Sequence, residues 1–197
     1  SVRLTASPRR DRLAGDKLPL RIATGRDFIR RVVVEADESP RGRGGFRPLA
    51  TLTATAADGR LRYDAKALAN VRLRVRPLDG GPRSRTVTYF VYPKFRYTVR
   101  QQGGQVVVPL TARGRGVGDL DVAMYVIRPG SRSGRRLDRT PLERTGPAGG
   151  AATLRFAPLK NVQAADYLVA CVPGAEDHGL GRRDFLAVRC GRASFRY

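Results

Sequence analysis

The chain has 197 residues, 41% of them hydrophobic, which excludes global disorder and suits two domains of about 95 to 100 residues better than one. Lys and Arg number 38 against 17 Asp and Glu, so the formal net charge is +21. This excess is spread over both halves of the chain, and it attracts polyanions such as nucleic acid, anionic wall polymers, acidic polysaccharides and anionic lipid headgroups.

Short segments of alternating apolar and polar residues, separated by Gly, Pro and Asp clusters, predict β-strands in the first half of the chain. The clearest is 71–76, where Val71 and Val75 point inward and the arginines between them point outward. Ala57-Asp58-Gly59 predicts a hairpin turn. The predicted strands of this half are 2–6, 18–23, 31–36, 49–56, 60–64, 71–76 and 85–92.

Pro93 predicts a domain boundary, because proline cannot donate to a strand ladder. We therefore expect domains at 1–93 and 94–197. The last strand should carry a bulge at Gly191, where the apolar parity changes. The predicted strands of the second half are 95–100, 105–111, 120–127, 136–143, 152–156, 167–172 and 185–197.

A weak internal repeat relates the two halves. Residues 61–63 (Leu-Arg-Tyr) precede 68–71 (Leu-Ala-Asn-Val), and 154–156 (Leu-Arg-Phe) precede 159–162 (Leu-Lys-Asn-Val), with a spacing that differs by two residues. No segment keeps a helical period over three turns. The predicted fold is therefore all-β, with two tandem antiparallel β-sandwiches.

The first half resembles bacterial immunoglobulin-like modules of secreted and surface proteins of actinobacteria. The matching stretches are 2–6 (Val-Arg-Leu-Thr-Ala), 46–50 (Phe-Arg-Pro-Leu-Ala), 57–60 and 70–76. The second half resembles a more divergent immunoglobulin or fibronectin type III sandwich, with Tyr167 similar to a corner tyrosine. The absence of tryptophan excludes the antibody type. The resemblance implies a spacer, stalk or adhesive unit, and it brings no catalytic residues.

Cys171 and Cys190 are the only cysteines, and they fall on predicted neighbouring strands with no histidine near them in sequence. We expect a disulfide, which indicates an oxidising compartment. The alternative is a pair of buried free thiols. Neither arrangement provides a zinc site.

Catalytic chemistry finds little support. His178, the only histidine, lies in a predicted loop, and the neighbouring carboxylates Asp119 and Asp121 lack the register of a calcium loop. We expect those carboxylates to form surface ion pairs with arginines. The chain is therefore predicted to be non-enzymatic, without a cofactor or a metal.

Seven arginines are the candidates for polyanion binding. Arg60 and Arg62 are expected on a strand next to 71–76, where they would form one cationic face with the arginines of that strand. A solvated face that protects the sheet edges is the alternative. Arg41 and Arg43 lie in an Arg-Gly segment that resembles an RNA-binding box but also suits a turn. The full set is Arg41, Arg43, Arg60, Arg62, Arg72, Arg74 and Arg76.

These observations together predict a secreted, extracellular or cell-envelope module with a structural or adhesive role. Its expected partners are anionic cell-wall polymer, acidic polysaccharide or other surface proteins. The alternative is a nucleic-acid or general polyanion-binding protein, although a specific nucleic-acid ligand is not expected. The apolar runs are too short to cross a membrane.

Overall fold

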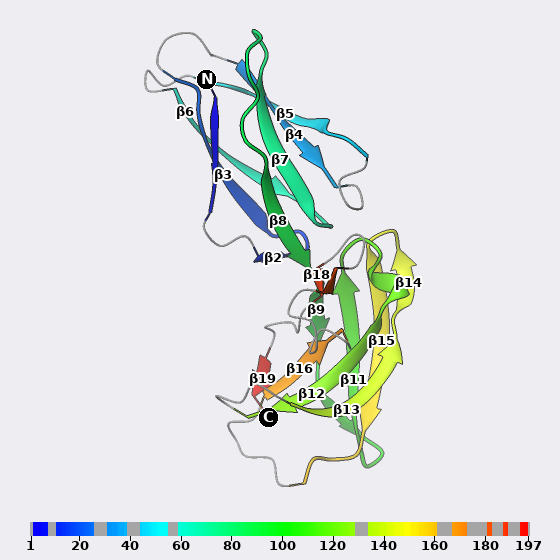
Figure 1. Cartoon of the computed structure of the whole chain (residues 1–197). Helices are drawn as coiled ribbons and strands as arrows, with labels where there is room; N and C mark the ends of the chain where they lie inside the picture. The colour runs from blue at the N-terminus through cyan, green and yellow to red at the C-terminus, as the bar shows by residue number, and fades with distance from the viewer. Residues whose placement is uncertain are drawn as a thin grey trace. The chain divides into compact units, whose positions relative to one another are not determined.

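The computed structural model describes residues 2–7, 11–25, 31–38, 44–54, 59–128, 134–160 and 168–172. For the backbone alone it also describes residues 167, 181–182, 187–188 and 194–196. The chain divides into two compact units, Ser1–Val91 and Tyr92–Tyr197. The boundary expected from the sequence lies after Pro93. Each unit is all-β and is built from facing antiparallel sheets (Figure 1).

Unit 1 has one sheet of three strands and one of five. The smaller sheet has the order β1 (Arg3–Ala6), β3 (Lys17–Ala23) and β6 (Arg60–Lys66). The larger sheet has the order β2 (Asp11–Leu13), β8 (Val87–Tyr92), β7 (Val71–Pro77), β4 (Arg31–Asp37) and β5 (Arg47–Thr53). β1, β3 and β6 take the places of immunoglobulin strands A, B and E, and β4, β7 and β8 those of C, F and G.

Unit 2 repeats this order. One sheet runs β10 (Arg100–Gln102), β11 (Gln105–Arg113), β15 (Gly149–Phe156) and β14 (Glu143–Gly146), and β9 (Lys94–Tyr97) also pairs with β11. The other runs β13 (Arg135–Pro141), β12 (Asp121–Ile127), β16 (Tyr167–Cys171) and β19 (Ser194–Arg196). A short 3-10 helix, η2 (Val117–Asp119), precedes β12. The shared strand order supports two related sandwiches in tandem.

Both cores consist of the apolar residues that alternate with polar residues along the strands. In β7 the apolar residues Val71, Leu73 and Val75 are buried and the arginines between them are half-buried, as the sequence predicted. In β3, Leu18, Leu20 and Ile22 face them from the other sheet and are almost fully buried. Period two thus gives each sheet one dry and one wet face.

One buried tyrosine in each unit joins the two sheets. In unit 1 the hydroxyl of Tyr89, on β8, donates to the carbonyl oxygen of Pro19, on β3, over 2.7 Å. In unit 2 the hydroxyl of Tyr97, on β9, donates to the carbonyl oxygen of Leu168, on β16, over 2.8 Å. Tyr167, the expected corner tyrosine, is described only in its backbone.

Two strand predictions were wrong. β5 and β6, which flank the turn predicted at 57–59, do not pair as a hairpin, because they belong to different sheets; residues 57 and 58 themselves lie outside the described residues. The single strand predicted at 185–197 is divided. Its first part, β18 (Ala187–Val188), pairs with β17 (Gly181–Arg182), whereas β19 pairs with β16. Gly191, the expected bulge, lies outside the described residues.

Candidate polyanion-binding surfaces

The predicted cationic face is divided between the two sheets of unit 1. Arg72, Arg74 and Arg76 lie on β7 in the five-stranded sheet, whereas Arg60 and Arg62 lie on β6 in the three-stranded sheet. The expectation that they share one face was wrong, because the chain crosses between sheets after β6. Arg41 and Arg43 lie outside the described residues.

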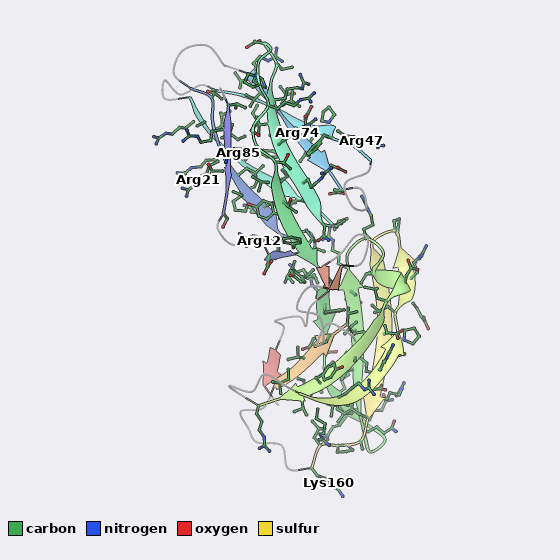
Figure 2. The ribbon with its side chains drawn as sticks, in the orientation of Figure 1. Arg12, Arg21, Arg47, Arg74, Arg85 and Lys160 are labelled. Atoms are coloured by element: carbon green, nitrogen blue, oxygen red, sulfur yellow. The ribbon has the colours of Figure 1, made fainter. Side chains whose placement is uncertain are left out.

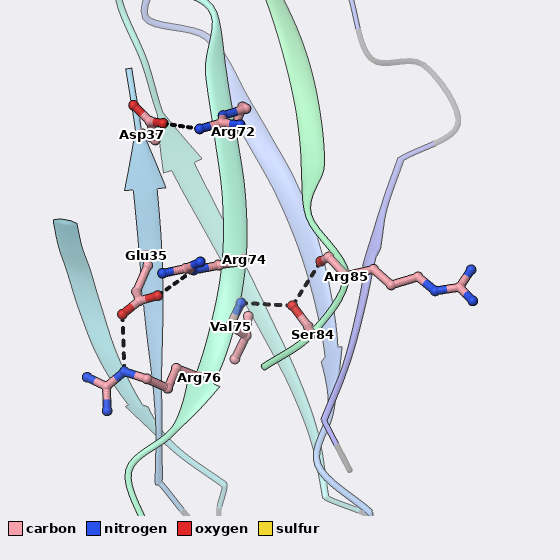
Figure 3. A network of polar contacts seen from close by, with 8 residues as sticks. All are labelled: Glu35, Asp37, Arg72, Arg74, Val75, Arg76, Ser84 and Arg85. Carbon is pink, nitrogen blue, oxygen red and sulfur yellow. Dashed lines mark hydrogen bonds and ion pairs between the residues drawn. The ribbon is translucent and has the colours of Figure 1, made fainter. Parts of the chain in front are cut away.

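On the β7 face, two carboxylates from the neighbouring strand β4 hold the arginines. Arg74 lies opposite Glu35 in the strand register, and Arg72 lies opposite Asp37. The Nε atoms of Arg74 and Arg76 lie 2.7 Å and 3.1 Å from the two carboxylate oxygens of Glu35. Arg72 forms an ion pair with Asp37. Figure 3 shows this ladder of ion pairs between the two strands.

The carboxylates of this ladder are buried. The side chain of Glu35 is 7% exposed and that of Asp37 is 0% exposed. Burial by itself would raise the pKa of Glu35, but hydrogen bonds from Arg74 and Arg76 outweigh it, and the pKa of Glu35 is lowered. Glu35 therefore stays ionised and holds both arginines.

An aromatic ring covers the same guanidinium groups. The Cζ atom of Arg74 lies 3.8 Å from the centroid of the Phe46 ring, and that of Arg72 lies 5.2 Å from it. Phe46 follows the Gly44-Gly45 pair of the Arg-Gly segment. Stacking and ion pairing together favour a structural role for Arg72, Arg74 and Arg76. Polyanion binding by these three residues stays a prediction.

The opposite face of unit 1, on sheet β1-β3-β6, presents its arginines differently. Arg21 on β3 lies directly opposite Arg62 on β6. Two residues further along β3, Ala23 lies between Arg3 on β1 and Arg60 on β6. All four arginines are exposed. No ion pair within the described part of the chain is recorded for Arg3, Arg21 or Arg62. Figure 2 shows Arg21 on the opposite side of unit 1 from Arg47 and Arg74.

We call this surface the open arginine face and define it by the outward residues of the three strands. Among the described residues it holds six basic side chains and one acidic side chain, all exposed: Arg3, Lys17, Arg21, Arg60, Arg62, Lys66 and Asp64. The Nζ atom of Lys17 lies 3.3 Å from a carboxylate oxygen of Asp64. Its net charge is therefore strongly positive. Arg3 and Arg21 were not among the sequence candidates, although the alternation around them could have placed them on this face.

A shallow depression lies in the open arginine face. It has a volume of about 360 Å³ and is lined by Pro19, Arg21, Arg62, Tyr63 and Asp64. A larger groove, of about 590 Å³, lies in unit 2, and threonine, proline and alanine residues line it together with Arg96, Tyr97, Leu110 and Glu143. One arginine and one glutamate balance each other in that groove, whereas the depression in unit 1 combines concavity with an excess of positive charge.

Asp119 and Asp121, the carboxylates expected to form surface ion pairs, each pair with one arginine. Asp119 pairs with Arg144 and Asp121 pairs with Arg139, so the surface ion pairs expected there are confirmed. Asp119 lies in η2 and Asp121 begins β12. No group of His, Cys, Asp and Glu within the described ranges is arranged to hold a metal ion. In the same ranges no helix has the length and apolar character needed to span a membrane.

The cysteine prediction stays partly open. Cys171 is fully buried on β16, against Ala123, and no cysteine in the described part of the chain is free. Cys190 and His178 lie outside the described residues. The Cys171–Cys190 bond therefore stays a prediction.

Comparisons with known proteins identify no family for this chain. No protein-family profile and no curated protein matches the chain. Similar solved structures include two marsupial T cell receptor chains. One is 12% identical with a TM-score of 0.34, covering 87% of this chain and 93% of the receptor chain. The other is 9% identical with a TM-score of 0.35, covering 99% and 100%.

A third similar structure is a GBS pullulanase, SAP, in complex with maltotetraose. It is 10% identical with a TM-score of 0.32, and the match covers 82% of this chain and 21% of the pullulanase. Likenesses at these scores carry no argument about function. The strand order identifies the chain as two tandem immunoglobulin-like β-sandwiches.

Proposed function

We propose that this chain is a non-enzymatic structural and adhesive module of the cell envelope that docks on an anionic wall polymer. The observation that carries the proposal is the open arginine face, where Arg3, Arg21, Arg60 and Arg62 are exposed on one sheet. The contrast with β7 supports it: Glu35 and Asp37 already hold the arginines there, whereas no ion pair is recorded within the described ranges for Arg3, Arg21 or Arg62.

The register of β3 and β6 gives the open arginine face a physical reason to bind anions. Like charges directly opposite each other on neighbouring antiparallel strands destabilise a sheet. Arg21 and Arg62 are such a pair. A bound phosphate, sulfate or carboxylate relieves their repulsion, and the planar guanidinium fork suits all three anions.

The extracellular part of the proposal depends on the predicted Cys171–Cys190 bond. The non-enzymatic part depends on the sequence, which has a single histidine and no nucleophile placed beside it. Both parts remain our proposal. A mass measurement of the secreted chain before and after reduction tests the extracellular part, because an intact disulfide takes up two electrons and two protons and the chain gains the mass of two hydrogen atoms.

The docking experiment measures binding of the full chain to immobilised poly(glycerol phosphate) over a salt series. We expect R21Q/R62Q to weaken binding about tenfold at physiological salt, since two phosphate contacts are lost. The matched control is R135Q/R155Q, which removes two exposed arginines from unit 2 and should weaken binding less than about twofold.

Equal losses in the two double variants would overturn the docking site, because the binding would then follow total charge alone. A parallel series with duplex DNA tests the rival function. Tighter binding to DNA than to poly(glycerol phosphate) at physiological salt would replace the proposal by nucleic-acid binding.

A further inference from the structure

We infer that the depression at Arg21, Arg62 and Asp64 selects an acidic polysaccharide over polyanions that lack free hydroxyl groups. The inference rests on the proposed function, because it assigns the ligand class of the same face. It concerns Asp64, the one carboxylate among the described outward residues of the open arginine face.

The two arginines of the depression form a site for one anionic group. They are direct partners across β3 and β6, so their Cβ atoms lie about 5 Å apart and their guanidinium groups reach a common anion. The depression around them has a volume of about 360 Å³. That volume is at the lower end of the range for small-ligand sites, and it fits a single charged sugar unit of a longer chain.

Asp64 supplies the second chemical element. It lies opposite Pro19, two residues along β6 from Arg62, on the same outward face of the sheet. Two residues along a strand correspond to about 7 Å, which is close to the width of a sugar ring. An ionised carboxylate only accepts hydrogen bonds. It therefore attracts hydroxyl groups and repels phosphate or sulfate, so the depression combines an anion site with a hydroxyl site.

The existing contact of Asp64 leaves this role open. Its ion pair with Lys17 is exposed, with side-chain exposures of 73% for Lys17 and 48% for Asp64. Exposed pairs of this kind contribute little to stability, and a carboxylate has acceptor sites beyond those that one ammonium group uses. Pro19 adds an apolar surface, against which the C–H groups of a sugar can pack.

Substitution of Asp64 distinguishes selection for hydroxyl groups from plain charge attraction, because the two hypotheses predict opposite changes in the affinity for a hydroxyl-bearing polyanion. Asp64→Ala raises the net charge of the open arginine face, so a generic polyanion site binds every polyanion more tightly after the change. A site that uses the carboxylate for sugar hydroxyls instead loses affinity for a hydroxyl-bearing ligand and gains affinity for one without hydroxyls.

The experiment compares chondroitin sulfate, which bears free hydroxyls, with inorganic polyphosphate, which has none along its chain, at physiological salt with the full chain. For D64A we expect chondroitin sulfate to bind about three- to tenfold more weakly, the scale of one lost hydrogen bond. Polyphosphate should bind more tightly. The matched control is E143A, which removes an exposed carboxylate from unit 2 and should leave the preference between the two ligands unchanged.

The possible outcomes separate the inference from the proposed function. If D64A strengthens binding of both ligands while R21Q/R62Q weakens both more than R135Q/R155Q does, the docking site stands and the selection for polysaccharide is wrong. If R21Q/R62Q and R135Q/R155Q behave alike, the docking site itself is wrong. Thermal unfolding of each variant verifies that it is folded.

Discussion

The hydroxyl of Tyr97 on β9 donates a 2.8 Å hydrogen bond to the carbonyl oxygen of Leu168 on β16, and this bond joins the two sheets of unit 2. The two residues are distant in the sequence, and both are buried. Such a bond matters because a buried carbonyl oxygen that loses its donor has no water to replace it.

Tyr97→Phe should lower the free energy of unfolding of unit 2 by about 1–3 kcal/mol, because it leaves the Leu168 carbonyl unsatisfied. Urea unfolding followed by circular dichroism measures the change. The control is Y63F, since Tyr63 is half-buried and no hydrogen bond of its hydroxyl is recorded within the described ranges. Equal effects of the two substitutions would contradict a structural role for the inter-sheet bond.

The raised pKa of the Tyr97 hydroxyl predicts a loss of stability at alkaline pH. Burial, opposed by a backbone hydrogen bond with Ala170, raises the pKa of Tyr97 from 10.0 to about 12. Between these values the folded chain keeps the phenolic proton and the unfolded chain has lost it, so the free energy of unfolding falls as the pH rises. Urea titrations from pH 9 to 12 should show a shallower fall for Y97F. A wild-type slope no steeper than that of Y97F would exclude this origin.

Glu35→Gln should destabilise unit 1 by about 1–3 kcal/mol, because Arg74 and Arg76 lose the charged acceptor that they share. The control is D64N, which removes the exposed ion pair of Asp64 with Lys17 and should lower the free energy of unfolding by only about 0–1 kcal/mol. Chemical unfolding at neutral pH measures both changes. A larger effect for D64N than for E35Q would contradict the difference in burial.

The lowered pKa of Glu35 gives this contribution a pH window. It is fully present above the ordinary pKa of a glutamate, about 4.3, and it is lost as the pH falls through the lower pKa of the folded state. The stability difference between the wild type and E35Q should therefore shrink in acid. A difference that is constant from pH 7 to pH 2 would rule out ionised Glu35 as its source.

Phe46→Ala should lower stability by about 0.5–2 kcal/mol, because it removes the ring that stacks on Arg74 and Arg72. The comparison variant is L49A, since Leu49 is 42% exposed and its truncation should change stability by less than about 0.5 kcal/mol. Thermal unfolding measures both changes, and we expect a lower melting temperature for F46A than for L49A. Indistinguishable melting temperatures would mean that the stacking contributes nothing measurable.

Gly59, at the start of the segment that carries Arg60 and Arg62, should tolerate no side chain. Its φ is +63°, and a Cβ atom there would lie 2.6 Å from the carbonyl oxygen of Gly25 and 2.6 Å from the Thr24 hydroxyl. Gly103 has a similar φ of +58° but open space around it. G103A should therefore cost only the conformational strain of about 1 kcal/mol, and G59A about 1–3 kcal/mol more. Equal unfolding free energies would exclude the steric clash.

The sequence predicted the strands well wherever period two was unbroken. The alternation of 71–76 placed Val71 and Leu73 in the core and Arg72 outside, because the pleat makes each parity a face of the sheet. It could not say which strands pair. Arg60 and Arg62 follow a turn signal that is typical of a hairpin, yet the strands on its two sides, β5 and β6, belong to different sheets.

The partners of the β7 arginines were also beyond the sequence. Glu35 directly follows an apolar run that includes Val33 and Val34, and Asp37 lies two residues further on, so in sequence both resemble the polar end of a buried strand. Only the register between β4 and β7 shows that they lie opposite Arg74 and Arg72. Register depends on distant residues, so local patterns leave it open.

The inter-sheet tyrosines have a consequence for how such a chain diverges. Tyr89 and Tyr97 each donate to a main-chain oxygen, that of Pro19 and that of Leu168. Every residue type supplies a main-chain oxygen, so these bonds place no demand on the side chains at positions 19 and 168. Each unit thus keeps its inter-sheet hydrogen bond as long as the tyrosine is retained. This bond does not restrict which residue type occupies the partner position.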